Sequence, residues 1–263
     1  MDRRREPLPT RVQDTRPLPA AYDVAVARGL AVLGIALPPA ALAAIDGHVR
    51  LLLAWTAVIN LTAIRKPAAV ALGHVVDSLS ALPLIEERAP GRVLDLGSGG
   101  GFPGFPLAAA LGGSGSATDV ALLEPIGKKA RFLETVAEAT GLADRVAVMP
   151  GRAEELAREP AGRGAWDLVT ARAVASTADL VELAFPLLAP GGALVAWKRR
   201  DLTAELNAAA RAVDALGGGS LDVIDVDVPE LAAHRLVVAA RSVGGHVPDR
   251  YPRDPGQRRR RPW

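Results

Sequence analysis

The fold is decided by residues 93–104, which read VLDLGSGGGFPG. An apolar run ends in a glycine-rich turn, and a helical stretch begins at Pro103. Glycines permit positive φ angles and let a ligand approach the bare backbone. In a doubly wound sheet, ligands bind at the carboxyl ends of the strands, near the point where the strand order reverses. The stretch therefore predicts a strand, a ligand-binding turn and a helix; a tight turn without a ligand is the alternative.

Short β-branched runs alternate with helical stretches from residue 92 onward. Strands are expected at residues 92–96, 120–123, 145–149, 166–170, 193–197, 221–228 and 235–240, and helices at 103–111, 128–140, 153–159, 179–188 and 201–216. This order predicts βαβ units and a parallel sheet covered on both faces. Alternating apolar and Asp residues in 221–228 are typical of an edge or antiparallel strand. We therefore expect one α/β domain over residues 91–247, with a seven-stranded Rossmann-like sheet.

The segments outside this domain differ from it in composition. Residues 21–90 are expected to form a helical extension, because apolar residues recur at helical spacing after Pro38 and Pro39. Residues 1–20 carry four prolines among Arg and Thr, which predicts a disordered basic arm. The formal charge of +2 divides into +2 for residues 1–20, −4 for residues 21–247 and +4 for residues 248–263. Because like charges at chain ends are typical of interaction tails, residues 248–263 are expected to be a mobile basic tail.

Composition excludes several classes of site. The chain has no cysteine, so disulfides, zinc–thiolate centres and cysteine nucleophiles are excluded. Its four histidines include no HxxxH pair, and we expect no metal. The longest apolar run, residues 30–45, is interrupted by Gly34, Pro38 and Pro39 and is too short to cross a bilayer. No apolar run directly follows Arg3–Arg5, so no secretory signal is evident. We expect a soluble, cytoplasmic monomer that does not enter a membrane.

The glycine pattern distinguishes between nucleotide ligands. Gly97, Gly99 and Gly101 run G-x-G-x-G, so the third glycine is misplaced for the G-x-G-x-x-G fingerprint of dinucleotide binding. The acid before the turn, Asp95, suits the positively charged methionine part of S-adenosylmethionine. Glu124 ends the next strand and is placed to accept both ribose hydroxyls, as acids do in other doubly wound nucleotide binders. The alternative for Glu124 is a helix-capping acid.

Charged residues follow the later strands at the same sheet edge. Ala153 and Glu154 follow the third strand and either lie beside the adenine or form a capped first helical turn. Arg172 follows the fourth strand and either pairs with the methionine carboxylate or an RNA phosphate, or lies on the surface. Two basic clusters are candidate contacts for RNA phosphates. The first is Lys128, Lys129 and Arg131, and the second is Lys198, Arg199 and Arg200. The alternative for the first cluster is a solvated helix face.

An ordered set of motifs carries a family resemblance. They are Trp55-x4-Asn60-Leu61-Thr62, His74-x2-Asp77-Ser78, Asp95-x-Gly97-x-Gly99-x-Gly101-x-Pro103-Gly104, Gly127-Lys128-Lys129-x-Arg131-Phe132-Leu133, Arg152-x-Glu154-Glu155, Arg172-Ala173, Trp197-Lys198, His234-Arg235-Leu236-Val237-Val238 and Tyr251-Pro252-Arg253-x2-Gly256. Over about residues 40–256, the chain resembles the glucose-inhibited division protein B family, the small-subunit ribosomal RNA guanine-N7 methyltransferases.

The resemblance implies a fold, a cofactor and a substrate. It implies a methyltransferase-type Rossmann domain with an N-terminal helical extension, S-adenosylmethionine as cofactor, and 16S ribosomal RNA or the small ribosomal subunit as partner. It places Gly97, Phe102, Ala153, Glu154 and Arg172 at the cofactor site. The chain departs from the family at Gly100, where proline is frequent, and this should soften the loop. The run Arg258, Arg259, Arg260 and Arg261 and the arm Arg3–Arg5 are expected to bind RNA phosphates.

The implied reaction needs no general base. Guanine N7 presents an in-plane lone pair, so positioning and desolvation can drive in-line methyl transfer, and no catalytic residue is assigned. His74 and Asp77 lie one helical turn apart and either join the extension to the Rossmann domain or approach the target base. The alternative functions are a non-catalytic RNA-binding assembly factor with the same fold, a methyltransferase for small molecules or proteins, and a nicotinamide oxidoreductase.

Overall fold

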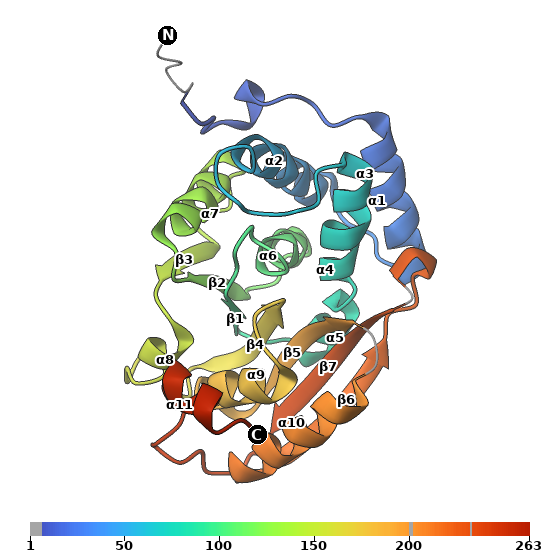
Figure 1. Ribbon diagram of the computed structural model, residues 1–263. Coiled ribbons are helices and arrows are strands. Elements are labelled where there is room, and N and C mark those ends of the chain that lie inside the picture. The colour runs from blue at the N-terminus through green and yellow to red at the C-terminus, as the bar shows by residue number, and fades with distance from the viewer. Residues whose placement is uncertain (1–6, 200–201, 232) are drawn as a thin grey trace.

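The computed structural model describes residues 7–199, 202–231 and 233–263 (Figure 1). Its centre is a seven-stranded sheet in the order β3-β2-β1-β4-β5-β7-β6. The strands are β1 (Arg92–Leu96), β2 (Asp119–Glu124), β3 (Val146–Pro150), β4 (Trp166–Arg172), β5 (Leu188–Arg199), β6 (Gly219–Asp225) and β7 (His234–Arg241). β1 to β5 are parallel, and β7 runs antiparallel to both β5 and β6. The strand order reverses between β1 and β4, which is where such sheets bind ligands.

Helices cover both faces of the sheet. The helical extension and two helices of the α/β domain cover one face. They are α1 (Ala20–Leu33), α2 (Pro39–Trp55), α3 (Pro67–Val70), the π-helical η2 (Ala71–Val76), α4 (Asp77–Leu79), α5 (Leu82–Arg88), α6 (Gly104–Gly113) and α7 (Gly127–Ala139). The other face is covered by α8 (Ala153–Leu156), α9 (Thr177–Ala184) and α10 (Thr203–Ala215). Short elements are η1 (Val12–Asp14), η3 (Pro229–Leu231) and α11 (Pro255–Arg260). Neighbouring strand residues alternate between the two cores, Val93 facing α6 and Leu94 facing α9, as the pleat requires.

The predicted α/β class and the seven-stranded sheet are confirmed. β6 is an antiparallel edge strand, as the alternation in residues 221–228 predicted, although it spans Gly219–Asp225. The helix expected at residues 179–188 ends at Ala184, because Pro186 lacks the N–H donor that would continue the helical hydrogen bonds. β5 is longer than expected and begins directly after this break, at Leu188.

The helical run of residues 67–88 passes through the core of the extension. It is long and apolar enough to cross a bilayer by length and composition, yet 56% of its apolar window is buried inside the protein. α1 packs against it so closely that a Cβ on Gly29 would lie 2.5 Å from Val76 Cγ2. Burial against other helices is what a core helix of a globular protein shows, so the run by itself is weak evidence for a membrane span.

The N-terminal arm differs from the prediction of disorder. Residues 7–19 lie along the outer side of α2 (Figure 1). The indole Nε1–H of Trp55 donates to the carbonyl of Pro9 at 2.8 Å, and Arg50 donates to the carbonyls of Val12 and Thr15 at 3.0 and 2.9 Å. Side-chain donors on α2 thus bind backbone carbonyls of the arm and fix it to the helix. The prediction is wrong for residues 7–20; Arg3–Arg5 lie outside the described residues.

The docking of this arm can be tested at Arg50. We expect Arg50→Met to lower the free energy of unfolding by about 2 kcal/mol, because hydrogen bonds to a charged donor are lost. The matched control is Arg16→Met, at an exposed arginine of the same arm. Denaturant unfolding of both variants measures the difference. Equal stability of the two variants would mean that the arm contributes nothing to the fold.

Candidate functional site

The loop after β1 curves over the carboxyl ends of two strands. Gly97, Gly99 and Gly101 have φ angles of +66°, +57° and +90°, in the left-handed region that favours glycine. The N–H groups of Gly97 and Ser98 both donate to the carbonyl of Leu123 in β2, at 2.9 and 3.2 Å. The glycines therefore let the chain turn sharply at the switch point while its backbone stays bonded to the neighbouring strand.

Glu124, at the end of β2, binds the backbone of this loop. One of its carboxylate oxygens accepts from the N–H of Gly99 and the other from the N–H of Ile126, both at 2.8 Å. The sequence predicted an acceptor for ribose hydroxyls at this position. The structure shows that this carboxylate also joins the loop after β1 to the loop after β2. Each oxygen keeps a further lone pair for a ligand hydroxyl.

Asp95 lies beneath the loop and has no path to a ligand. Its side chain is fully buried, accepts from Thr170 Oγ1 at 2.8 Å and from the N–H of Gly104 at 3.3 Å, and burial raises its pKa to about 6. Gly104 permits this contact, since a Cβ there would lie 2.8 Å from Asp95 and 2.4 Å from Leu122. The expectation that Asp95 faces a cationic cofactor is therefore wrong; it joins the start of α6 to β1 and β4.

His48 of α2 holds the loop from above. Its Nε2–H donates to the carbonyl of Gly100 at 2.7 Å, and its ring stacks on Phe102 with centroids 4.5 Å apart. Burial lowers the pKa of His48 to about 4. The ring of Phe102 also stacks on His74, with centroids 4.7 Å apart. The loop is thus held at Gly100 by a hydrogen bond from the helical extension, at the position where the resemblance leads one to expect proline. His48 was not among the predicted residues, although it lies one turn from Ile45 and Leu52 on the buried face of α2.

Arg172 joins β4 to the helical extension. Its Nη1 donates to Asp77 Oδ2 at 2.9 Å and to the carbonyl of Gly73 at 3.0 Å, and its Nη2 donates to His74 Nδ1 at 2.9 Å. The guanidinium also lies 5.3 Å above the ring of Phe102. His74 and Asp77 join the extension to the sheet, as one of the two expectations held, and they also line the cavity described next. Their approach to a target base stays a prediction. Arg172 is thus paired within the protein through both of its terminal nitrogens, and it also lines the same cavity.

A cavity of about 440 Å³ opens at the carboxyl ends of β4 and β5. Its walls come from the extension, from the ends of β4 and β5, and from β7; among them are Thr62, His74, Asp77, Arg172, Trp197 and His234. Through His74 and Arg172, which both contact Phe102, the cavity adjoins the glycine loop. A larger cavity of about 870 Å³ lies between the N-terminal arm and α2 and includes no residue of the strand ends. Within the described residues, no group of His, Asp and Glu side chains is placed to hold a metal.

The predicted basic residues divide into engaged and exposed side chains. Lys198 donates to the carbonyl of Ala175 at 2.7 Å and to Glu205 at 2.6 Å, whereas Arg199 is exposed at the rim of the cavity. On α7, Lys128 and Arg131 are exposed and Lys129 is half-buried. Arg200 lies outside the described residues.

Comparison with known proteins supplies the family. The family model described as rRNA small subunit methyltransferase G matches residues 41–231. The ribosomal RNA small subunit methyltransferase G of Dehalococcoides mccartyi is 39% identical over 87% of this chain and 94% of its own length, and that of Chloroflexus aggregans is 42% identical over 80% and 85%. This chain belongs to that family. The O-methyltransferase from Bacillus cereus, solved in complex with SAH, shares the fold with a TM-score of 0.56 at 18% identity over 84% of this chain and all of its own.

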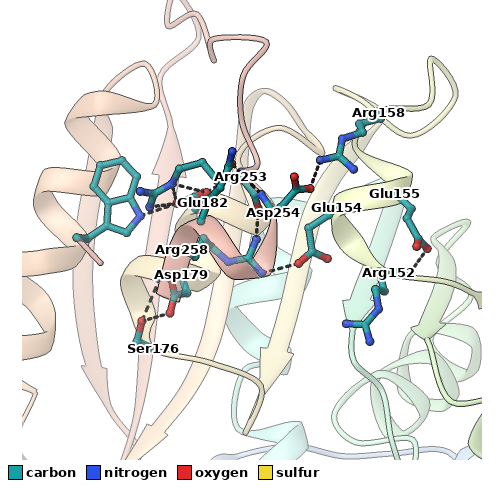
Figure 2. A network of polar contacts seen from close by, with 12 residues as sticks. Arg152, Glu154, Glu155, Arg158, Ser176, Asp179, Glu182, Arg253, Asp254 and Arg258 are labelled. Carbon is teal, nitrogen blue, oxygen red and sulfur yellow. Dashed lines mark hydrogen bonds and ion pairs between the residues drawn. The ribbon is translucent and has the colours of Figure 1, made fainter. Parts of the chain in front are cut away.

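In this member of the rRNA small subunit methyltransferase G family, the C-terminal segment is docked (Figure 2). Arg258 of α11 forms an ion pair with Glu154 of α8, in which both side chains are largely buried. Arg253 binds Glu182 of α9 through both of its carboxylate oxygens, and the indole of Trp263 donates to the same carboxylate at 2.7 Å. Glu182 is fully buried and needs these partners.

The docked segment corrects two expectations. Residues 248–263 are not a mobile tail, because buried carboxylates of α8 and α9 bind their arginines. Arg258 is engaged with Glu154 and is unavailable to RNA, while Arg259, Arg260 and Arg261 are exposed. Glu154 is buried and paired with Arg258, so its carboxylate is not free, and Ala153 beside it at the start of α8 is buried as well.

The role of His48 can be tested by its pH dependence. We expect His48→Phe to keep the stacking on Phe102 and to speed amide hydrogen exchange in residues 97–104. Burial lowers the pKa of His48 to about 4 in the folded protein, whereas the unfolded chain takes up this proton below about pH 6.5. The free energy of unfolding of the parent should therefore fall between pH 6.5 and pH 4, by at most ~1.4 kcal/mol per pH unit. The variant lacks this group, so the stability of the parent relative to the variant should fall over the same range.

The control for that experiment is His246→Phe, at an exposed histidine. This variant should leave both the loop exchange rates and the pH dependence of unfolding at the parent values. A constant difference in stability between the parent and His48→Phe from pH 7 to pH 4 would contradict the burial of a neutral ring.

The docking of the C-terminal segment can be tested at Arg258. We expect Arg258→Met to lower the free energy of unfolding by about 3 kcal/mol, because it leaves the carboxylate of Glu154 buried and unpaired. Arg259→Met, at the exposed neighbour on the same helix, should change it by less than about 0.5 kcal/mol. Equal effects of the two substitutions, measured by denaturant unfolding, would show that the ion pair does not hold the segment.

Proposed function

We propose that this protein transfers a methyl group from S-adenosylmethionine to N7 of a guanine in 16S ribosomal RNA. One observation carries the proposal: the glycine loop at the switch point adjoins a cavity at the ends of β4 and β5, in a chain of the rRNA small subunit methyltransferase G family. A site for a nucleotide cofactor and a site for a second molecule thus lie side by side, as a group transfer requires.

The residues of the loop fit S-adenosylmethionine. A Cβ on Gly99 would meet no atom closer than Gly97 O at 3.7 Å, so the backbone there is open to a ligand. We assign Gly97, Gly99, Gly101 and Phe102 to the loop that binds the cofactor, with Glu124 for the ribose and Ala153 with Glu154 beside the adenine. Arg172 acts through its partners rather than by direct contact. When bound, the cofactor supplies an electrophilic methyl group on a sulfonium.

The protein's part in the reaction is to bind, orient and exclude water. Guanine N7 carries an in-plane lone pair and loses no proton, so no general base is needed. Holding N7 in line with the methyl group can supply ~7–11 kcal/mol of the barrier. Because N7 faces a groove of A-form RNA that side chains cannot read, the target guanine should be in a loop or an open assembly intermediate.

Several basic side chains around the site are exposed and could contact RNA. We propose that RNA phosphates are bound by Lys128 and Arg131 on α7, by Arg199 at the cavity rim and by the exposed Arg259–Arg261. Lys198 and Arg258 are already paired within the protein and hold the site together instead. We further propose that the protein acts as a monomer in the cytoplasm, where ribosomal subunits assemble, without a membrane contact.

The deciding experiment is methyl transfer to naked 16S ribosomal RNA and to small ribosomal subunits, followed by mapping of the modified base. We expect label on N7 of one guanine. Glu124→Gln should weaken S-adenosylmethionine binding by ~10–100-fold in calorimetry, because an amide cannot accept from both Gly99 and Ile126. Glu138→Gln, at an exposed position of α7, is the matched control.

Two outcomes would overturn the proposal. Label only on protein or small molecules would change the substrate class. Absence of S-adenosylmethionine binding by the parent protein, with RNA binding intact, would favour a non-catalytic assembly factor that has the same fold.

A further inference from the structure

Asp77 fixes the proton of a histidine in the wall of the cavity. The Nδ1 atom of His234 lies 2.7 Å from Asp77 Oδ1, while Arg172 donates to Asp77 Oδ2. A carboxylate that receives a guanidinium on one oxygen is ionised and can only accept, so Nδ1 of His234 carries the proton. In the neutral ring, the lone pair then belongs to Nε2.

His48 and His74 have the opposite arrangement. His74 accepts from Arg172 at Nδ1, so its proton is on Nε2 and is donated to Thr62 Oγ1 at 2.7 Å. His48 donates from Nε2 to the carbonyl of Gly100. Nε2 of His234, by contrast, has no hydrogen-bond partner within the described part of the chain. The structure therefore presents an unused acceptor at the cavity wall.

The position of His234 suits the far edge of a purine. β7 lies beyond β5 in the sheet, whereas the glycine loop lies at β1, on the other side of β4. A base in the cavity that turns N7 towards the loop turns its opposite edge towards β5 and β7. In guanine, that edge carries N1–H and the amino group, which are donors. A cavity of about 440 Å³ is in the range of small-molecule sites.

We propose that this cavity holds the target guanine and that Nε2 of His234 accepts a hydrogen bond from its N1–H. The inference rests on the proposed function and names a catalytic residue for it. In the reaction, the N7 lone pair forms a bond to the methyl carbon, the carbon–sulfur bond breaks, and its electron pair stays on sulfur. The base becomes a cation and keeps its N1 proton.

The contact with His234 stabilises the transition state more than the ground state. Positive charge that develops at N7 makes N1–H more acidic, so its hydrogen bond to Nε2 strengthens as the methyl group moves.

The same contact selects guanine over adenine. Adenine has a lone pair at N1, which would face the lone pair of Nε2, and a site built for a donor rejects an analogue that lacks it.

The proton position is tested without the reaction. The chain has four histidines, so nitrogen-15 spectra of their rings at pH 8 can be assigned individually. We expect His234 with its proton on Nδ1, and His48 and His74 with theirs on Nε2. In Asp77→Asn, the amide can donate to Nδ1 and shift the His234 proton to Nε2. A proton on Nε2 of His234 in the parent overturns the inference.

The contact with N1–H is tested by exchanging the base. RNA substrates carry guanine, inosine or 2-aminopurine at the target; inosine keeps N1–H, and 2-aminopurine has a lone pair there. We expect the parent to prefer inosine over 2-aminopurine and His234→Leu to lose at least 10-fold of that preference. His234→Gln, whose amide oxygen can accept, should restore part of it, and His246→Leu at an exposed histidine should equal the parent.

The outcomes separate the inference from the proposed function. If the parent methylates no guanine, the proposed function fails. If the parent methylates guanine and His234→Leu keeps the full preference for inosine, the inference alone is wrong. Calorimetry of S-adenosylmethionine should give the same affinity for the parent and His234→Leu; a 10-fold loss there would show that His234 acts through the cofactor loop.

Discussion

The buried ion pair between Arg172 and Asp77 is the interaction on which the rest of the structure depends. Only 2% of the Asp77 side chain is exposed, and a charge so buried is tolerated only when its partners are in place. Arg172 occupies one oxygen of Asp77 and His234 the other, while the indole of Trp197 donates to the backbone carbonyl of Asp77. A single residue of the helical extension thus joins β4, β5 and β7.

This junction explains why the extension packs on the sheet edge where ligands bind. Removing the extension would leave Arg172 with neither Asp77 nor the carbonyl of Gly73, and both would have to be replaced by water. The π-helical turn of residues 71–76 precedes Asp77 and contributes that carbonyl. The walls of the cavity are therefore held by the same bonds that hold the extension on the sheet.

The glycine loop is held from two sides by residues distant in sequence. Glu124 binds it from the sheet and His48 binds it from α2. Flexible glycines are needed for the positive φ angles, but a flexible loop loses entropy when it binds a ligand. The two braces reduce that loss before any ligand arrives. The C-terminal segment has the same effect on α8, through Arg258 and Glu154. Residues 7–19 and 248–263, the described parts of the two chain ends, are accordingly part of the fold.

The sequence by itself determined the alternation of strands and helices, the edge strand at β6 and the glycine turn after β1. These follow from hydrophobic periodicity and from the φ angles that glycine allows, which are properties of a few neighbouring residues. The motifs also indicated the family. Only the tertiary structure decided which charges are free. Glu154 and Arg258 are separated by 104 residues, and Asp77 and His234 by 157, so no local pattern shows that they meet. A buried charge selects its partner from whichever elements the fold brings beside it.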